Sequence, residues 1–592
     1  MSRFRVCTAI GMTTALLASC SGTDHKPVAD ASTPAAKAQP EFVVAARDRR
    51  DAELPVPPPP PPPPPALQEV VVTGARAAPG RQDLRSASPI MMQAPAIAMN
   101  RLPIDMPRRP GYHDEGRDKF TAVAENPFRI TREEPVSTFS IDVDTASYSF
   151  VRGALNRNVL PQPAAVRTEE MINYFPYDYR APASAAEPFS TAVSVFPSPF
   201  TAGRKLVRIG IRGYAIQHAT RPRANLVFLI DTSGSMNEPN KLPLVKQSLS
   251  MLVDQLDAKD RVAIVTYAGY AGTALEPTPA SEKSKILAVI DRLGAGGGTA
   301  GAEGIRQAYA LAEQNFDKEG VNRVLLATDG DFNIGITNQN ELKGFVERER
   351  GKGVFLSVLG YGMGNYNDAL MQALAQNGNG TAAYIDTIAE ARKTLVEEAS
   401  STLFPIAKDV KIQVEFNPAA VREYRLIGYE TRMLAREDFD NDKVDAGDVG
   451  SGQTVTALYE IVPVGGPAAI GDLRYAAPAP RVATASTEYG YVKIRYKLPR
   501  SDSSKLIETP IARANEAATF DAAPRDARFA TGVAAFAELL KGGKYGGSLS
   551  YDDVLRIATA ARGDDAYGYR SEFVQLVRAA KTARSLAQLG QQ

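Results

Sequence analysis

Three oxygen-bearing side chains follow directly after an apolar run near the middle of this 592-residue chain. The run is LVFLI at residues 226–230, and Asp231, Ser233 and Ser235 come after it at a spacing of two. A polar turn at the end of a buried strand is one explanation. A cation site is the other, because a hard divalent cation such as Mg²⁺ takes oxygen ligands in near-octahedral geometry. The elements around these residues help to distinguish the two.

Two loops further along the chain carry polar residues of the same kind. Thr299 lies in the glycine-rich stretch GAGGGTAGAEG at 294–304, and Asp329 follows the apolar run VLLAT. In an open α/β sheet, ligands bind where loops meet at the carboxyl ends of parallel strands. Asp231 and Asp329 each stand at the end of an expected strand, so both carboxylates are expected at that edge.

Residues 224–400 alternate between apolar strands and amphipathic helices. The expected strands are 225–231, 261–268, 322–330, 353–362 and 382–387, and the expected helices are 242–256, 281–293, 302–316 and 338–350. In the first of these helices, Leu249, Leu252 and Leu256 recur at helical spacing. This alternation predicts a doubly wound, Rossmann-like, mostly parallel sheet with helices on both faces.

Further strands are expected on both sides of this α/β unit. Before it, the pattern indicates a helix that starts with Asp144 or Thr145 as its cap and ends before Pro161, and a second helix at 166–175. Strands are then indicated at 189–200 and 205–216. After it, the pattern indicates strands at 408–418, 424–430, 453–464 and 488–499, then helices at 527–543, 550–562 and 568–589. The strands after the unit are typical of a β-sandwich or a β-layer. For the whole flank we expect one antiparallel β-layer built from both sides, with the α/β domain inserted and helices at the carboxyl end.

The amino terminus has the pattern of a secretory signal. Two arginines precede the apolar run VCTAIGMTTALLA, which is too short to span a bilayer as a helix. Residues 17–20, LASC, resemble a bacterial lipobox, which implies that Cys20 is lipidated and becomes the first mature residue; cleavage beside an incidental cysteine is the alternative. Ser21 after the cysteine favours the outer membrane by analogy. We expect a lipid-anchored protein of the cell envelope that faces the periplasm.

An unstructured tether is expected between the signal and the folded part. Residues 20–130 are rich in Ala, Pro, Ser and Arg, and the consecutive prolines Pro57 to Pro65 favour an extended polyproline helix. Within the tether, LQEVVVTGAR at 67–76 resembles the segment with which many TonB-dependent receptors open their mature chains. That resemblance implies contact with a TonB-type energy transducer; a β-prone patch in an unstructured tail is the alternative.

Composition excludes several classes of function. The formal charge of +1 argues against nucleic-acid binding, which needs a concentrated basic surface. Three histidines leave almost no material for a zinc site or a Ser-His-Asp hydrolase. Both cysteines, Cys7 and Cys20, fall in the signal segment, so the mature domains contain no disulfide.

Three other patterns have simple explanations. The glycines of 294–304 are not followed by Lys-Ser/Thr, so a phosphate loop is rejected, and GYGMGN at 360–365 fits a loop after a strand. Residues 438–448 begin like a calcium loop, but Lys443 stands where the EF-hand glycine belongs and Val449 where its glutamate belongs. An acidic solvated loop is the better interpretation.

The five polar residues together resemble the metal-ion-dependent adhesion site of the von Willebrand factor type A (VWA) domain. Its Asp-x-Ser-x-Ser motif matches Asp231, Ser233 and Ser235, its loop threonine matches Thr299, and its second aspartate matches Asp329. FSIDVDTASYSFVR and EEMINYF before the domain, and KYGGSLSYDDVLRIATAARGDDAYGYRSEFVQLV after it, are similar to bacterial VWA lipoproteins with a characteristic region on each side. That similarity covers about residues 130–585 and implies no activity for the C-terminal region.

The resemblance implies what the site does. It implies Mg²⁺ or Mn²⁺, coordinated directly by Ser233, Ser235 and sometimes Thr299, and through water by Asp231 and Asp329. The ion keeps enough charge to capture an Asp or Glu carboxylate of a protein partner, so the expected role is adhesion and not catalysis. A structural envelope scaffold that binds through its flanks or tether is the alternative. A hydrolase in the C-terminal region has no nucleophile elbow or paired His and Cys to support it.

The expected organisation follows from these patterns. The chain divides into a signal peptide at 1–19, a tether at 20–130, an N-terminal VWA-associated region at 131–221, the VWA domain at 222–402 and a β-rich, then helical region at 403–592.

Overall fold

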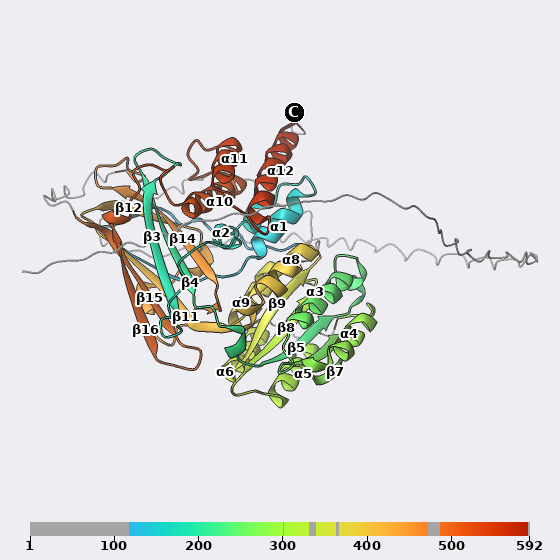
Figure 1. Cartoon of the computed structure of the whole chain (residues 1–592). Helices are drawn as coiled ribbons and strands as arrows, with labels where there is room; N and C mark the ends of the chain where they lie inside the picture. The colour runs from blue at the N-terminus through green and yellow to red at the C-terminus, as the bar shows by residue number, and fades with distance from the viewer. Residues whose placement is uncertain (1–117, 300, 331–338, 363–365, 472–485, 590–592) are drawn as a thin grey trace, which may run out of the picture. The chain divides into compact units, whose positions relative to one another are not determined.

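The computed structural model describes residues 118–299, 301–330, 339–362, 366–471 and 486–589 (Figure 1). The predicted signal peptide, Cys20, the proline run and the segment 67–76 lie outside the described residues. No helix in the described part of the chain has the length and apolar character that crossing a membrane requires.

A six-stranded sheet forms the centre of the α/β domain, in the order β10-β9-β8-β5-β6-β7. The strands are β5 (Ala224–Asp231), β6 (Arg261–Tyr267), β7 (Ala271–Pro279), β8 (Val321–Thr328), β9 (Val354–Tyr361) and β10 (Ala382–Ile385). All neighbours pair in parallel except β6 and β7, which are antiparallel. The predicted doubly wound, mostly parallel sheet is confirmed.

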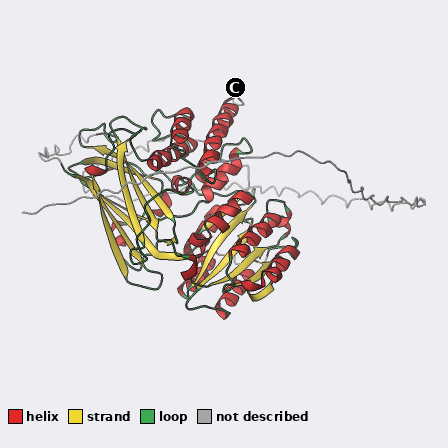
Figure 2. Ribbon diagram, viewed as in Figure 1, coloured by secondary structure: helices red, strands yellow, loops and turns green. Residues whose placement is uncertain are grey.

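Helices cover both faces of this sheet (Figure 2). They are α3 (Leu242–Gln255), α4 (Lys283–Arg292), α5 (Gly301–Gln314), α6 (Gln339–Gly351) and α7 (Asp368–Asn377). Val227 and Leu229 of β5 pack in one core with α5, α6 and α7, whereas Leu226 and Phe228 pack in the other with α3 and α4. Because successive side chains of a strand point to opposite faces, the continuous apolar run of β5 fits a strand buried on both sides.

Parts of the domain were not predicted from the sequence. The antiparallel edge strand β7 buries only Leu275 and Thr278 and ends in proline, so its apolar pattern is weak. After β10 the chain forms α8 (Ile388–Arg392), a π-helical segment (Lys393–Glu397) and α9 (Ala399–Leu403), which are short and therefore carry little periodicity.

Two antiparallel sheets form a sandwich beside the α/β domain, so the β-sandwich alternative holds and the single β-layer does not. The first has the order β1 (Arg129–Ile130), β12 (Val421–Ile427), β14 (Thr454–Pro463), β4 (Lys205–Gly213) and β3 (Phe189–Pro197). The second has the order β13 (Gly447–Gly450), β11 (Pro405–Phe416), β15 (Glu488–Lys497) and β16 (Ser504–Ala512), with β2 (Val136–Ser140) also paired to β11. Val207 and Ile209 of the first sheet share a core with Ile412 and Val492 of the second. Each sheet contains strands from both flanks, as expected.

The C-terminal helices pack on helices of the N-terminal region. They are α10 (Arg525–Lys541), α11 (Tyr551–Ala560) and α12 (Tyr569–Leu589), and their partners are α1 (Ala146–Leu155) and α2 (Thr168–Asn173). The ring of Phe175 lies 4.9 Å from that of Phe529 and 5.6 Å from that of Phe573, edge to face in each case. The two flanks of the α/β domain therefore share a helical core as well as both sheets.

Two expectations about the N-terminal region need correction. Residues 118–130, assigned to the tether, belong to the fold: Asp118 accepts a hydrogen bond from Tyr366 N at 2.8 Å, and Phe120 packs on Phe150 at 4.5 Å. Thr145 stands at the N-cap of α1 but makes no side-chain cap bond. Asp144 does not cap the helix either, because its carboxylate accepts from Ala382 N at 2.8 Å and pairs with an arginine of the C-terminal region.

Candidate metal centre

Asp231 is fixed at the carboxyl end of the central strand β5. Its Oδ1 accepts a hydrogen bond from Ser233 N at 2.9 Å, and its Oδ2 accepts from Tyr267 Oη at 3.1 Å and Thr328 Oγ1 at 3.2 Å. Tyr267 ends β6 and Thr328 ends β8, so both neighbouring strands hold this carboxylate. Burial, with a smaller contribution from Asp329, raises the pKa of Asp231 to about 6, against the hydrogen bonds from Ser233. A cation beside the carboxylate would relieve this cost of burial.

The two serine hydroxyls lie side by side in the turn that follows β5. Ser233 Oγ and Ser235 Oγ are 3.1 Å apart; Ser233 is buried and Ser235 is exposed. Adjacent ligands of an octahedral Mg²⁺, each about 2.1 Å from the ion, are about 3.0 Å apart. The spacing of the hydroxyl oxygens therefore fits two neighbouring positions of such a shell, and the exposed side leaves room for water or a ligand.

The loop that carries Thr299 is docked on this turn through its backbone. Gly296 N donates to Thr232 O at 2.8 Å, and Gly234 N donates to Gly297 O at 3.1 Å. Gly297 has φ +85°, and a Cβ there would lie 3.2 Å from Gly269 N of the β6–β7 turn. Glycine therefore lets three loops meet, which places the half-buried Thr299 two residues beyond the contact.

Asp329 follows β8, the strand that pairs with β5 on the side away from β6. The register aligns Ile230 with Ala327, which puts Asp231 and Asp329 at the same edge. Asp329 is fully buried, and its Oδ2 lies 3.1 Å from the ammonium of Lys241, whose side chain is 5% exposed. The predicted site residues thus come to one edge of the sheet, together with a cation of the chain itself.

Three residues of the centre were not found from the sequence. Tyr267 and Thr328 hold Asp231, and Lys241 pairs with Asp329. Tyr267 and Thr328 lie within the expected strands 261–268 and 322–330, and nothing in their spacing marked them as contacts of Asp231. Lys241 directly precedes an expected helix, and nothing in its spacing distinguishes it from an ordinary exposed lysine.

The donor set suits a hard cation. The described residues contain no group of three or more His, Cys, Asp and Glu side chains arranged to hold a metal. At this edge the donors are instead two carboxylates and hydroxyls, all oxygen, as Mg²⁺ prefers. In the acidic stretch at 438–448, Asp440 and Asp442 pair with Arg495 at 3.4 Å and 3.1 Å, in line with a solvated loop.

Known families match most of the described chain. Residues 114–208 match the family described as von Willebrand factor, residues 225–398 match the von Willebrand factor type A domain, and residues 401–583 match the C-terminal region of the uncharacterized protein YfbK. The fold and these matches define a VWA-domain protein with an additional region on each side.

Similarity over most of the chain identifies the family within the VWA-domain proteins. The uncharacterized protein YfbK of Escherichia coli (strain K12) is 43% identical over 481 residues, which are 80% of this chain and 83% of that protein. The chain therefore belongs to the YfbK family. The uncharacterized protein sll0103 of Synechocystis is 25% identical over 313 residues, 52% of this chain and 70% of that protein. A solved von Willebrand factor type A structure from Catenulispora acidiphila is 17% identical, with a TM-score of 0.37, and the alignment covers 67% of this chain and 91% of that one.

Proposed function

We propose that the VWA domain binds a divalent cation, Mg²⁺ or Mn²⁺, and through it an Asp or Glu carboxylate of a protein partner. The observation that carries this proposal is the pair of hydroxyls of Ser233 and Ser235, 3.1 Å apart beside the buried carboxylate of Asp231. VWA domains are protein-interaction modules, and this chain carries oxygen-bearing side chains at the edge of the sheet where ligands bind in α/β folds, which supports the proposal.

Each residue has a distinct role in this proposal. Ser233, Ser235 and Thr299 offer neutral oxygens to the ion, whereas Asp231 and Asp329 balance its charge from behind. A bound ion supplies a positive charge on the exposed side of Ser235, where an anionic side chain can reach it. Because the ligand is held by charge and no bond is broken, the proposed activity is binding and not catalysis.

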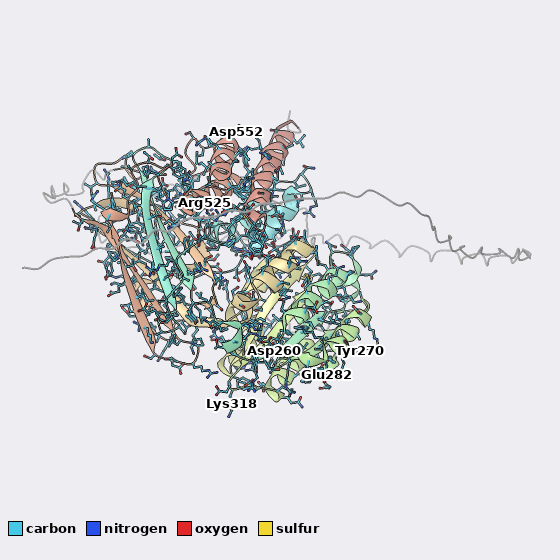
Figure 3. All side chains as sticks on the ribbon, viewed as in Figure 1. Asp260, Tyr270, Glu282, Lys318, Arg525 and Asp552 are labelled. Atoms are coloured by element: carbon cyan, nitrogen blue, oxygen red, sulfur yellow. The ribbon has the colours of Figure 1, made fainter. Side chains whose placement is uncertain are left out.

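An exposed aromatic side chain extends the proposed contact surface. Tyr270, labelled in Figure 3, is 80% exposed in the turn between β6 and β7. The same turn contributes Gly269, which lies against the loop of Thr299. Tyrosine is enriched at the centre of protein interfaces because it buries a large apolar area. A partner therefore gains an apolar contact beside the metal-bound carboxylate.

Calorimetric titration of Mg²⁺, Mn²⁺ and Ca²⁺ into the whole chain tests the metal site. We expect one saturable site in the unaltered protein and none in Asp231→Asn, whose thermal stability is checked in parallel. The matched control is Asp254→Asn, an exposed aspartate of α3, which should bind as the unaltered protein does. Equal affinity in Asp231→Asn and the control would refute the site.

A chelator distinguishes metal-bridged adhesion from its alternative. Partner binding that EDTA abolishes and Mg²⁺ restores supports the proposal. Partner binding that survives EDTA would favour the alternative, a structural envelope protein that interacts through the flanking sheets, the helices or the segment 67–76.

We also propose an envelope location for this activity. Lipidation of Cys20 would anchor the chain, with outer-membrane retention on the periplasmic side as the expected outcome. Incorporation of labelled palmitate by the unaltered protein, and its loss together with membrane association in Cys20→Ser, tests the anchor. A Cys20→Ser protein that fractionates with the outer membrane as before would contradict it.

A further inference from the structure

A buried lysine lies against the proposed metal site. Lys241 Nζ is 3.1 Å from Asp329 Oδ2, and its side chain is 5% exposed. The other carboxylate near it, Glu238, is 3.8 Å away and 63% exposed, so solvent weakens that pair. A buried ammonium is costly unless a charged partner compensates it, and Asp329 is that partner.

The fold makes a specific space for this side chain. Gly362, which directly follows β9, has φ +75°, and a Cβ there would lie 2.5 Å from Lys241 Cε and 2.7 Å from Lys241 Cγ. The aliphatic stem of Lys241 therefore packs against the backbone of Gly362, where the side chain of any other residue would collide with it. Lys241 also stands at the N-cap of α3, where its carbonyl accepts from Val245 N at 2.9 Å. Backbone and stem together direct the ammonium towards Asp329.

Lys241 changes the formal charge of the site in both of its states. Asp231, Asp329 and Lys241 together carry one negative charge, and a divalent cation turns this into one positive charge. Without the lysine the empty site would carry two negative charges, and the loaded site would be neutral. A carboxylate ligand is attracted to the positive site and much less to the neutral one.

We infer that Lys241 is a counter-charge built into the metal site, which limits its affinity for divalent cations and keeps the loaded site cationic, so that it selects an anionic ligand. This inference rests on the proposed cation site and adds a residue that sets its specificity. In the absence of metal, the ammonium offsets the negative charge of the buried Asp329. With metal bound, the same ammonium leaves the site with one excess positive charge, which the carboxylate of the partner neutralises.

The test compares the whole chain with Lys241→Gln and Lys241→Met. Glutamine keeps a hydrogen-bond donor and methionine keeps the stem, and both remove the charge. The matched control is Lys285→Met, an exposed lysine of α4. Free Mn²⁺ is measured by electron paramagnetic resonance at pH 7.5, and [1-¹³C]acetate relaxation on the Mn²⁺-loaded proteins reports a carboxylate that reaches the ion.

We expect both Lys241 variants to bind Mn²⁺ at least about tenfold more tightly than the unaltered protein and the control. We expect their acetate relaxation enhancement to fall at least about threefold. A lysine that only holds the loop in place would give the opposite direction, because its loss would disorder the ligands and weaken Mn²⁺ binding. That result, or equal affinity, overturns the inference while the metal site stands. Absence of Mn²⁺ binding in every protein overturns both the inference and the proposed function.

Discussion

Substitution of Arg152 in α1 tests most directly how the flanking regions hold the α/β domain. Its guanidinium is 3% exposed and pairs with Asp386, which directly follows β10, and with Glu390 of α8 at 2.8 Å. It also reaches Glu572 of α12 at 3.1 Å and donates to Tyr174 Oη at 2.9 Å. One side chain from the N-terminal region thus binds carboxylates of the VWA domain and of the C-terminal helices.

The structure sets the size of the effect of Arg152→Met. Asp386 and Glu390 are 8% and 1% exposed, and without the arginine they are buried charges that have lost this cation. Removing one partner of a buried ion pair costs about 3–5 kcal/mol. The pair with Glu572 adds little because that carboxylate is 37% exposed. We expect Arg152→Met to lower the free energy of unfolding by about 3–5 kcal/mol at pH 7.5.

Urea denaturation followed by far-ultraviolet circular dichroism measures this loss, since the chain has no tryptophan. The matched control is Arg292→Met, an exposed arginine at the end of α4, with an expected change below about 0.5 kcal/mol. Burial already raises the pKa of Asp386, and the variant raises it further. The folded variant then binds a proton that the unfolded chain releases, so its deficit should shrink as the pH falls to about 5. A loss below about 1 kcal/mol, or one independent of pH, would refute the reasoning.

Three further predictions concern single side chains. Burial raises the pKa of Glu169 to about 8 from an ordinary 4.5, so the folded protein keeps a proton that the unfolded chain loses. The free energy of unfolding should therefore fall as the pH rises from about 5 to 8. In urea denaturation, Glu169→Gln should remove up to about 1.4 kcal/mol per pH unit of this pH dependence. Gly362→Ala combines a positive φ with a contact 2.5 Å from Lys241 Cε, so calorimetry should show a loss of more than about 1 kcal/mol. Tyr267→Phe removes the hydroxyl that orients Asp231 at 3.1 Å, and Mg²⁺ affinity in calorimetric titration should fall about tenfold while thermal stability changes by about 1 kcal/mol.

The α/β domain was predictable because its signals are local. The run LVFLID in β5 is apolar at every position before its aspartate, and β5 is buried on both faces, so composition and burial agree. The polar residues at strand ends could be located from the same signal. Asp231 and Asp329 come to one edge because parallel strands align their carboxyl ends, which needs no knowledge of side-chain contacts.

The sandwich was predicted only in part because its pairings are long-range. Strand β2 pairs with β11 through Gln413 and Thr138, and β4 pairs with β14 through Val207 and Tyr459. The residues of a single strand do not indicate which strand on the other side of the inserted domain will pair with it. The sequence therefore could not show whether these strands form one sheet or two. Lys241 was missed for a related reason: its role comes from Asp329 and Gly362, which lie 88 and 121 residues further along the chain.

One residue of the sandwich holds both chain segments that connect the α/β domain to the flanks. Ser451 Oγ accepts from Ile216 N at 2.8 Å, before β5, and Ser451 N donates to Phe404 O at 2.9 Å, before β11. The domain is thus held where its chain enters and leaves, whereas the proposed ligands follow the opposite ends of β5 and β8. The hydrogen bonds described for Asp231, Ser233 and Lys241 all stay inside the domain. Binding of the proposed cation at that edge would therefore act through contacts of the inserted domain alone, at the end of the sheet opposite to its hydrogen bonds with Ser451.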